Sequence, residues 1–415
     1  MTFNSKFWIK FSLLNLCIVA FLGVIMRYKM GFEFPYLNQR NLQHSHSHFA
    51  FAGWITHTLM VLMVYFLQTK IVDFTGNQYT KTIIANLVCS YGMLISFIIQ
   101  GYGAFSIFFS TASIVVSCYF GYQYFKDLIQ VDNNLLSKNW FKAAILFNVL
   151  SSFGTFYLAY MMVTKNTSQD LHLAAINFYL HFQYNGWFFF AAMGLFFSFM
   201  NLKKEDHPFY ETTFKLFALA CIPAYFLSII WLNFPLWVYI ITVFSATIQV
   251  YTWFKFFFII SKNTTAFLKK QISILKYILL FVGLALSIKF LLQLGSTYPS
   301  LNKLAFGFRP IVIAYLHLVL LAVFSLFLLF YIYVSPFFIM TKRIKFGLLI
   351  FTVGVFLNEI VLAIQGTTFF SYTMIPFANE QLFLIALMLF LGIGIITFST
   401  IKKLKVEYPK SYLKI

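Results

Sequence analysis

Charged side chains are scarce in this chain of 415 residues. They make up 10% of it, while 61% of the residues are hydrophobic, and an ordinary soluble domain carries roughly a quarter charged residues. This composition excludes a water-soluble fold, which has no use for so much apolar surface. The charge that is present is one-sided, with 30 lysines and arginines against 11 acidic residues.

Cysteine and proline are also few. The four cysteines, Cys17, Cys89, Cys118 and Cys221, lie in apolar runs and form no CxxC pair. We therefore expect small core residues, and predict neither disulfides nor a zinc site. The nine prolines stand mostly near the ends of apolar runs. No long linker, low-complexity tract or internal repeat is visible, so a single membrane domain is expected over residues 1–415.

The apolar residues occur in blocks of about 20 to 25, and a helix needs about 20 to cross ~30 Å of hydrocarbon. The first block follows Lys6 and Lys10 without a small-residue cleavage site, which favours a span over a signal peptide. Because lipid leaves backbone groups no other open partner, helices are expected. The sequence thus predicts an all-α bundle of about twelve transmembrane helices, at residues 7–28, 47–68, 80–101, 103–125, 139–162, 171–200, 211–231, 235–260, 271–293, 309–334, 344–365 and 379–402.

Basic residues concentrate at one side of these predicted spans. The connections 3–4, 7–8 and 11–12 on the other side carry no lysine or arginine. By the positive-inside rule, both termini are predicted to be cytoplasmic. The protein itself is expected in the inner membrane of the cell. The same rule accounts for the formal net charge of +19, so no nucleic-acid partner is expected. The basic residues on the predicted inner side are Lys6, Lys10, Lys70, Lys81, Lys126, Lys138, Lys203, Lys204, Lys262, Lys269, Lys270, Lys342, Arg343, Lys345, Lys402, Lys403 and Lys405.

Histidine within the hydrocarbon is costly and marks functional sites. Seven of the eight histidines lie in or beside even-numbered spans, which all run inward: His44, His46, His48 and His57 in span 2, His172 and His181 in span 6, and His317 in span 10. We therefore predict that His46, His181 and His317 lie at a similar depth near the external face. A haem or metal site in a bundle needs such ligands from facing helices. The alternative for each is a hydrogen bond between helices.

The HSHSH run at the start of span 2 allows two arrangements. In a helix, His44 and His48 share one face while His46 points elsewhere. If the run is extended, all three can bind one surface metal ion. In span 6, Asn177, His181 and Asn185 form one polar stripe facing the bundle.

Charged residues near the external face are further candidates. Glu359, the sole carboxylate in the interior of a predicted span rather than at its first residues, is expected to be a proton acceptor, an ion-pair partner, or a neutral hydrogen-bonded acid. Arg27, Arg40 and Arg309 lie at external span ends, against the positive-inside trend. They suit haem propionates, which arginine binds bidentately, or lipid headgroups.

These residues resemble the catalytic subunit of the haem-copper oxidase superfamily, which has a twelve-helix core and histidine ligands on helices 2, 6, 7 and 10. HSHFAFAG, from His46 to Gly53, is similar to the low-spin haem motif of its divergent branches. AYLHLVLLAVFSLF resembles the family's tenth helix and puts His317 on the other low-spin haem ligand. HFQYNGW is similar to a nitric oxide reductase motif and puts His181 on a ligand of the non-haem metal.

Two departures from the family pattern limit what the resemblance implies. Tyr315 replaces the axial ligand of the reactive haem, and span 7 has no histidine. Tyrosine can ligate haem iron, so Tyr315 and Glu359 remain candidate catalytic residues. With His181 they would line an altered second pocket. Copper or non-haem iron is not expected, because Cu(II) prefers several nitrogen donors.

The resemblance thus implies a b-type haem between His46 and His317, with Arg309 or Arg40 near its propionates. The implied role is electron transfer, gas binding or a divergent reduction of O2 or NO. A quinol or a cytochrome c-like protein would be the donor, and other respiratory subunits would be partners. Two alternatives stay open: a twelve-span secondary transporter, and a haem- or copper-handling assembly factor that captures metal through the HSHSH run.

Overall fold

The computed structural model describes residues 2–232, 234–269, 272–302, 309–370 and 375–402, without the side chains of 263–269, 309 and 369–370. These parts of the chain contain helices and no strand, apart from one isolated bridge between Leu135 and Lys203. The helices are α1 (Ser5–Gly31), α2 (Gln39–Phe49), η1 (Ala50–Thr56), α3 (His57–Lys70), α4 (Gln78–Gln100), α5 (Ala104–Leu128), α6 (Leu136–Val163), α7 (Gln169–His181), η2 (Phe182–Phe188), α8 (Phe189–Phe199), α9 (Pro208–Cys221), η3 (Pro223–Ile229), α10 (Leu236–Lys269), α11 (Ser273–Gly295), α13 (Arg309–His317), η4 (Leu318–Ser325), α14 (Leu326–Val334), α15 (Lys342–Phe370) and α16 (Ala378–Ile401).

The prediction of an all-α, multi-pass membrane protein is confirmed. Ten described helices are long and apolar enough to cross a membrane, and an eleventh is added if α9 and η3, bent by 44°, count as one span. The continuous helix formed by α7, η2 and α8 is of similar length, but Gln183 and Asn185 lie in its middle. Twelve crossings therefore stay a prediction.

Apolar side chains point out of the bundle while polar ones are buried in it. On α5, Phe105, Phe108 and Tyr122 are each more than half exposed. Asn86 of α4 and Asn148 of α6 are buried. Water does not tolerate such a large exposed apolar surface, whereas lipid does.

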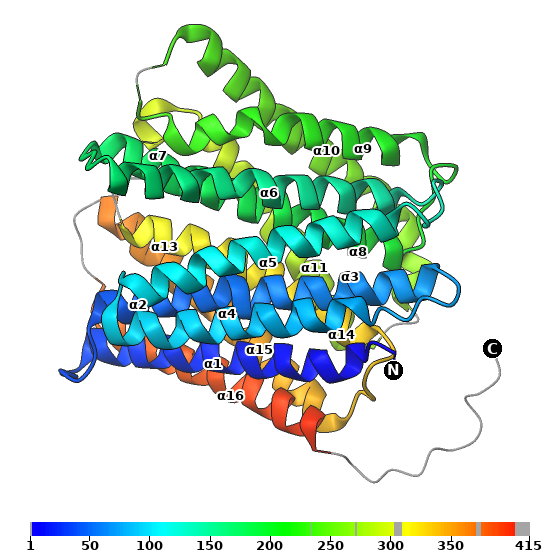
Figure 1. Ribbon diagram of the computed structural model, residues 1–415, viewed down its shortest axis with the longest axis horizontal. Coiled ribbons are helices and arrows are strands. Elements are labelled where there is room, and N and C mark those ends of the chain that lie inside the picture. The colour runs from blue at the N-terminus through cyan, green and yellow to red at the C-terminus, as the bar shows by residue number, and fades with distance from the viewer. Residues whose placement is uncertain (1, 233, 270–271, 303–308, 371–374, 403–415) are drawn as a thin grey trace.

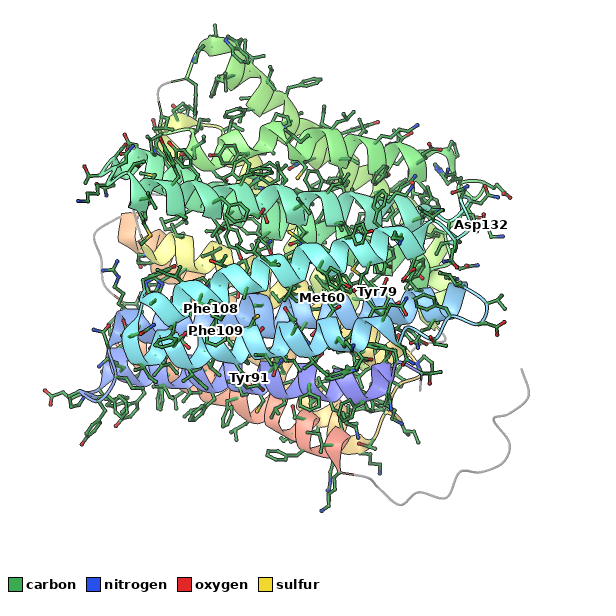
Figure 2. The ribbon with its side chains drawn as sticks, viewed as in Figure 1. Met60, Tyr79, Tyr91, Phe108, Phe109 and Asp132 are labelled. Carbon is green, nitrogen blue, oxygen red and sulfur yellow. The ribbon has the colours of Figure 1, made fainter. Side chains whose placement is uncertain are left out.

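The helices lie side by side along one direction, and α1 begins at the end of the bundle where α16 finishes (Figure 1). Figure 2 shows Asp132, in the connection from α5 to α6, at this same end, and Phe108 and Phe109 toward the other. We call the end with Asp132 the lysine-rich end. The other end, where α2, α7 and α13 begin, is called the α2 end.

Glycine lets some neighbouring helices approach closely. A Cβ added to Gly392 of α16 would lie 2.8 Å from the backbone nitrogen of Phe351 on α15. Small residues serve this purpose in membrane bundles, where close van der Waals packing drives association. The long α15 and α16 therefore form a tightly packed pair beside α1 (Figure 1).

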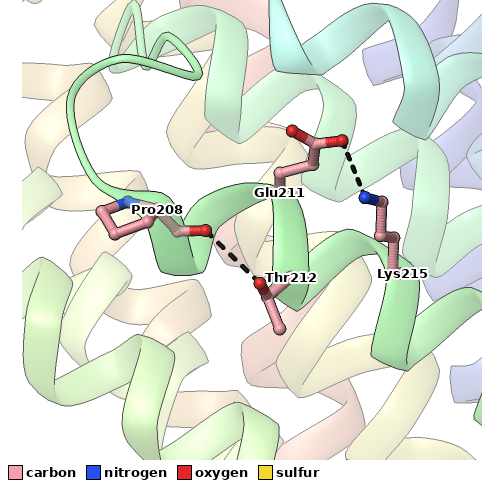
Figure 3. A network of polar contacts seen from close by, with 4 residues as sticks. All are labelled: Pro208, Glu211, Thr212 and Lys215. Atoms are coloured by element: carbon pink, nitrogen blue, oxygen red, sulfur yellow. Dashed lines mark hydrogen bonds and ion pairs between the residues drawn. The ribbon is translucent and has the colours of Figure 1, made fainter.

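Polar residues at helix starts determine where some helices begin. Asn38 accepts hydrogen bonds from the backbone N–H groups of Arg40 and Asn41 at 2.9 and 3.2 Å, so α2 begins at Gln39 rather than near residue 47. At the start of α9, Lys215 forms an ion pair with Glu211 at 3.0 Å (Figure 3). Both of these side chains are exposed, so this pair stabilises the helix little.

Three π-helices occur within the spans that contain the histidines: η1, η2 and η4. The Trp54 indole of η1 donates to Ser325 of η4 at 2.9 Å, and the Trp187 indole of η2 donates to Thr56 of η1 at 3.4 Å. The three π-helices are thus joined through the middle of the bundle. Such π-segments are rare in proteins overall, and those that occur are often found at functional sites.

Candidate functional site

The three histidines predicted to share a depth all stand on the same side of the π-helices. His181 and His317 are the last residues of α7 and α13, directly before η2 and η4. His46 precedes η1 by one helical turn. Since α2, α7 and α13 begin at the same end of the bundle (Figure 1), the three imidazoles lie in the half nearer the α2 end.

One ring nitrogen of His317 makes a hydrogen bond, and the structure gives no hydrogen bond for the other. Its Nδ1–H donates to the carbonyl of Ile313, one turn earlier, at 2.8 Å. This bond orients the ring and leaves the lone pair on Nε2. An imidazole held in this way is suited to ligate a metal, because the partner of the other nitrogen determines which nitrogen is available.

His46 lies near His317, which belongs to another helix. The two imidazoles are near enough to interact electrostatically. His46 also packs against α1, where a Cβ added to Gly23 would lie 3.7 Å from its Cε1. The Val19 carbonyl is within reach of the ring, yet the buried Nδ1 makes no hydrogen bond of good geometry. An orphaned ring nitrogen within a membrane bundle is costly and needs a partner.

His46, His317 and the helical turns near them are partly exposed. All described residues at 311–317, 176–180 and 23–27 have intermediate exposure. Packing is tighter beyond the π-helix of span 10, where residues 322–333 are all buried.

Arg27 of α1, rather than Arg40, lies close to the pair. Its charge interacts with both His46 and His317. Arg40 is exposed and interacts with His44 and Tyr102, and its predicted place near haem propionates stays a prediction. The side chain of Arg309 falls outside the described residues.

His181 is held by hydrogen bonds at both ring nitrogens. Its Nε2 lies 2.9 Å from the Cys221 carbonyl of α9, and its Nδ1 lies 3.1 Å from the amide nitrogen of Asn185. This leaves no lone pair for a metal. These two hydrogen bonds correspond to the alternative given for each histidine from the sequence, in which His181 links helices by hydrogen bonding.

Tyr315 belongs to a neighbouring polar group that links three spans. Its ring lies edge-on to that of Tyr184 in η2, with 6.2 Å between centroids. The Tyr184 hydroxyl interacts with the Tyr315 hydroxyl and with Ser228 of η3. Asn177 of α7 donates to the Ser228 carbonyl at 3.2 Å. Tyr315 therefore has a local hydrogen-bonding role.

Glu359 lies on α15 and has no basic partner among the described residues. Its carboxyl accepts a hydrogen bond from the amide of the neighbouring Asn358 at 3.1 Å, and the side chain is partly exposed. Exposed apolar residues flank it, including Phe356 and Ile360. The position fits a carboxyl group at the edge of the bundle better than one inside the second pocket predicted with His181 and Tyr315.

The HSHSH run is helical, so His44 and His48 share a face that points away from His46. Both imidazoles pack against Tyr102 in the turn between α4 and α5. His48 Nε2 lies 3.2 Å from the Tyr102 hydroxyl. One metal ion shared by His44, His46 and His48 would require the extended alternative.

The other histidines lie apart from these groups. His57 is fully buried beside Trp8, and neither ring nitrogen has a hydrogen bond of good geometry. The Nδ1 of His207 caps α9 by accepting from the Phe209 N–H at 3.0 Å. His172 is exposed.

Lys289 on α11 is a buried polar residue that did not enter the predictions. Its ammonium lies 4.1 Å from the Phe290 ring centroid and interacts electrostatically with Cys221 and His181. It is 3% exposed. The sequence feature that could have identified Lys289 is its position inside the apolar run at 273–295.

Across the described ranges, no three histidine, cysteine or acidic side chains are grouped to hold a metal ion. Two imidazoles on opposite sides of a haem need no such group. No protein-family model and no curated protein sequence matches this chain.

Proposed function

We propose that this protein is a membrane cytochrome of haem-copper oxidase type, with one b-type haem held between His46 and His317. The observation that carries the proposal is the proximity of these two histidines, which belong to separate helices and lie on one side of the joined π-helices. His317 Nε2 is available, His46 Nδ1 lacks a good partner, and both residues are partly exposed. These features fit a planar iron-containing group bound from both faces.

The residues around the pair would each perform one task. The Ile313 carbonyl orients the His317 ring through Nδ1–H. Arg27 supplies a positive charge near both imidazoles, which suits the carboxylates of haem propionates. His181 and Tyr315 hold neighbouring spans together through hydrogen bonds, and we do not include them among the ligands.

Electron transfer is the activity that this arrangement favours. A b-type haem held by both His46 and His317 would supply one-electron chemistry, and the two histidines would leave no ligand position for a gas. The proposed electron donor is a quinol or a cytochrome c-like protein. The absence of histidine from span 7 argues against a copper centre beside it.

We further infer twelve crossings, with the lysine-rich end in the cytoplasm. A chain whose first helix begins on the side where its last helix ends crosses an even number of times (Figure 1). Ten described helices are long and apolar enough to span the membrane. Gln169–Phe199 and the bent α9–η3 pair, counted as one span each, bring the total to twelve. The basic connections then lie inside, and the His46–His317 pair lies toward the external face.

The absorption spectrum of the purified protein tests the haem proposal. We expect sharp reduced-haem bands with about one haem b per chain, lost in His46→Ala and in His317→Ala. His172→Ala, which changes an exposed histidine, is the matched control. His317→Met covers the case in which an alanine variant fails to fold, because it should keep the haem and shift its bands.

A colourless protein after expression with ample haem would overturn the proposal. Bands that survive both alanine substitutions would do the same. Substrate-driven uptake into liposomes by the colourless protein would then favour the transporter alternative.

A further inference from the structure

His44 and His48 are four residues apart on α2 and present their imidazoles on the same face. The His48 ring stacks on Phe97 of α4 with 4.4 Å between centroids, and the His44 ring meets the edge of Tyr102 at 4.7 Å. Two histidines at this spacing on a helix can bind one metal ion together, as they do in helical zinc sites.

Tyr102 is held against α2 by the short turn between α4 and α5. Gly101 has a φ of +63°, and a Cβ there would lie 2.5 Å from Oδ1 of Asn41. Only glycine allows both the left-handed conformation and this close approach. Ser106 closes the turn, since its hydroxyl accepts from the Gly103 N–H at 2.8 Å and donates to the Gly101 carbonyl at 2.7 Å.

The helix that carries the two histidines is fixed to α4 as well. Ser45, which is fully buried, donates to the Leu94 carbonyl at 2.7 Å. The imidazoles on α2 and the phenol after α4 are thus positioned before any ligand binds. Such preorganisation is a requirement of a specific metal site.

Three potential metal ligands therefore lie close together, since the rings of His44 and His48 both contact Tyr102. His48 Nε2 lies 3.2 Å from the Tyr102 hydroxyl. His44 Nε2 is buried and has no hydrogen-bond partner, which is costly unless another group satisfies it. Arg40, one turn earlier, interacts electrostatically with both His44 and Tyr102, and its charge would favour a phenolate.

We propose that His44, His48 and Tyr102 form a binding site for one divalent transition-metal ion at the α2 end of the bundle. Two imidazoles and a phenolate oxygen suit Cu2+ and Zn2+, and copper binds such donors more tightly by the Irving–Williams order. The site is separate from the His46–His317 pair, because His46 lies on a different face of α2. It does not depend on the haem proposal.

Copper titration of the full-length protein, purified with a tag that lacks histidine, tests this site. With Cu2+ as the probe, we expect one tightly bound ion per chain and an electron paramagnetic resonance spectrum with coupling to two imidazole nitrogens. His44→Ala and His48→Ala should each weaken binding by about 10- to 100-fold or more, and Tyr102→Phe by about tenfold. His172→Ala should bind as the unchanged protein does.

The same affinity in His44→Ala, His48→Ala and the unchanged protein would overturn the proposal, as would coupling to a single nitrogen. His44→Asn retains a polar side chain and replaces His44→Ala if the latter does not fold. The readout is the copper signal rather than haem absorption, so either proposal can fail while the other stands.

Discussion

The imidazoles of His46 on α2 and His317 on α13 lie within electrostatic range of each other, although most of the chain separates them in sequence. Arg27 of α1 interacts with both. Three spans therefore contribute to one polar site in a bundle whose interior is otherwise largely apolar. Ionisable side chains brought together at one level of a membrane protein mark a functional site.

Removing the charge of Arg27 should change the haem potential. Arg27→Gln takes away a positive charge that destabilises oxidised iron, so the midpoint potential should fall. A loss of about 1 to 2 kcal/mol of interaction corresponds to roughly 40 to 90 mV for one electron. Redox titration of the reduced-haem band measures this shift. Arg40→Gln is the control, and equal shifts in both variants would contradict the assigned position of Arg27.

Loss of His181 should reduce stability and spare the haem. His181→Ala leaves the Cys221 carbonyl and the Asn185 amide without their partner, which should lower the free energy of unfolding by about 1 to 3 kcal/mol. Thermal unfolding in detergent provides the measurement. If the haem spectrum of the folded variant changed instead, His181 would be a ligand after all.

Glu359 should react with a lipid-soluble carbodiimide. Its side chain is partly exposed among apolar residues of α15 and has no basic partner among the described residues, and carbodiimides modify protonated carboxyl groups in apolar surroundings. Mass spectrometry of labelled membranes should find the adduct at Glu359, and Glu359→Gln should abolish it. Absence of the adduct would indicate an ionised or inaccessible carboxylate. The haem spectrum of Glu359→Gln should be unchanged.

Copper binding at His44 and His48 should strengthen as pH rises. Burial raises the pKa of the Tyr102 phenol, and nearby Arg40 opposes this shift. The phenol therefore carries its proton at neutral pH and releases it when it becomes a ligand, so affinity increases with pH. Tyr102→Phe should show a shallower dependence, lower by about one proton per ion. Identical slopes would remove Tyr102 from the ligand set.

The apolar blocks were sufficient to predict most helices. The expected span at 80–101 is α4 at Gln78–Gln100, and the one at 379–402 is α16 at Ala378–Ile401. The early start of α2 was not predicted, because its HSHSH segment is polar and depends on the Asn38 cap and on packing against α4. The π-helices could not be predicted, since they depend on contacts between spans such as that of Trp54 with Ser325.

Spacing along single helices predicted only part of the site. The common inward direction of the even-numbered spans was enough to place His46 and His317 in the same half of the bundle. The partner of His181 is a carbonyl on another span, Cys221, which no pattern within α7 reveals. Whether Arg27 or Arg40 lies near the two imidazoles depends on how α1 and α2 are rotated about their axes in the bundle. The sequence of each span alone does not contain that information.

The most direct test of the haem account is electron paramagnetic resonance of the oxidised, purified protein at low temperature. We predict a low-spin ferric signal of the kind that two axial imidazoles produce, converted to a high-spin signal in His46→Ala or His317→Ala. A high-spin signal in the unchanged protein, or a low-spin signal that both substitutions leave intact, would contradict the claim that these two histidines hold the iron.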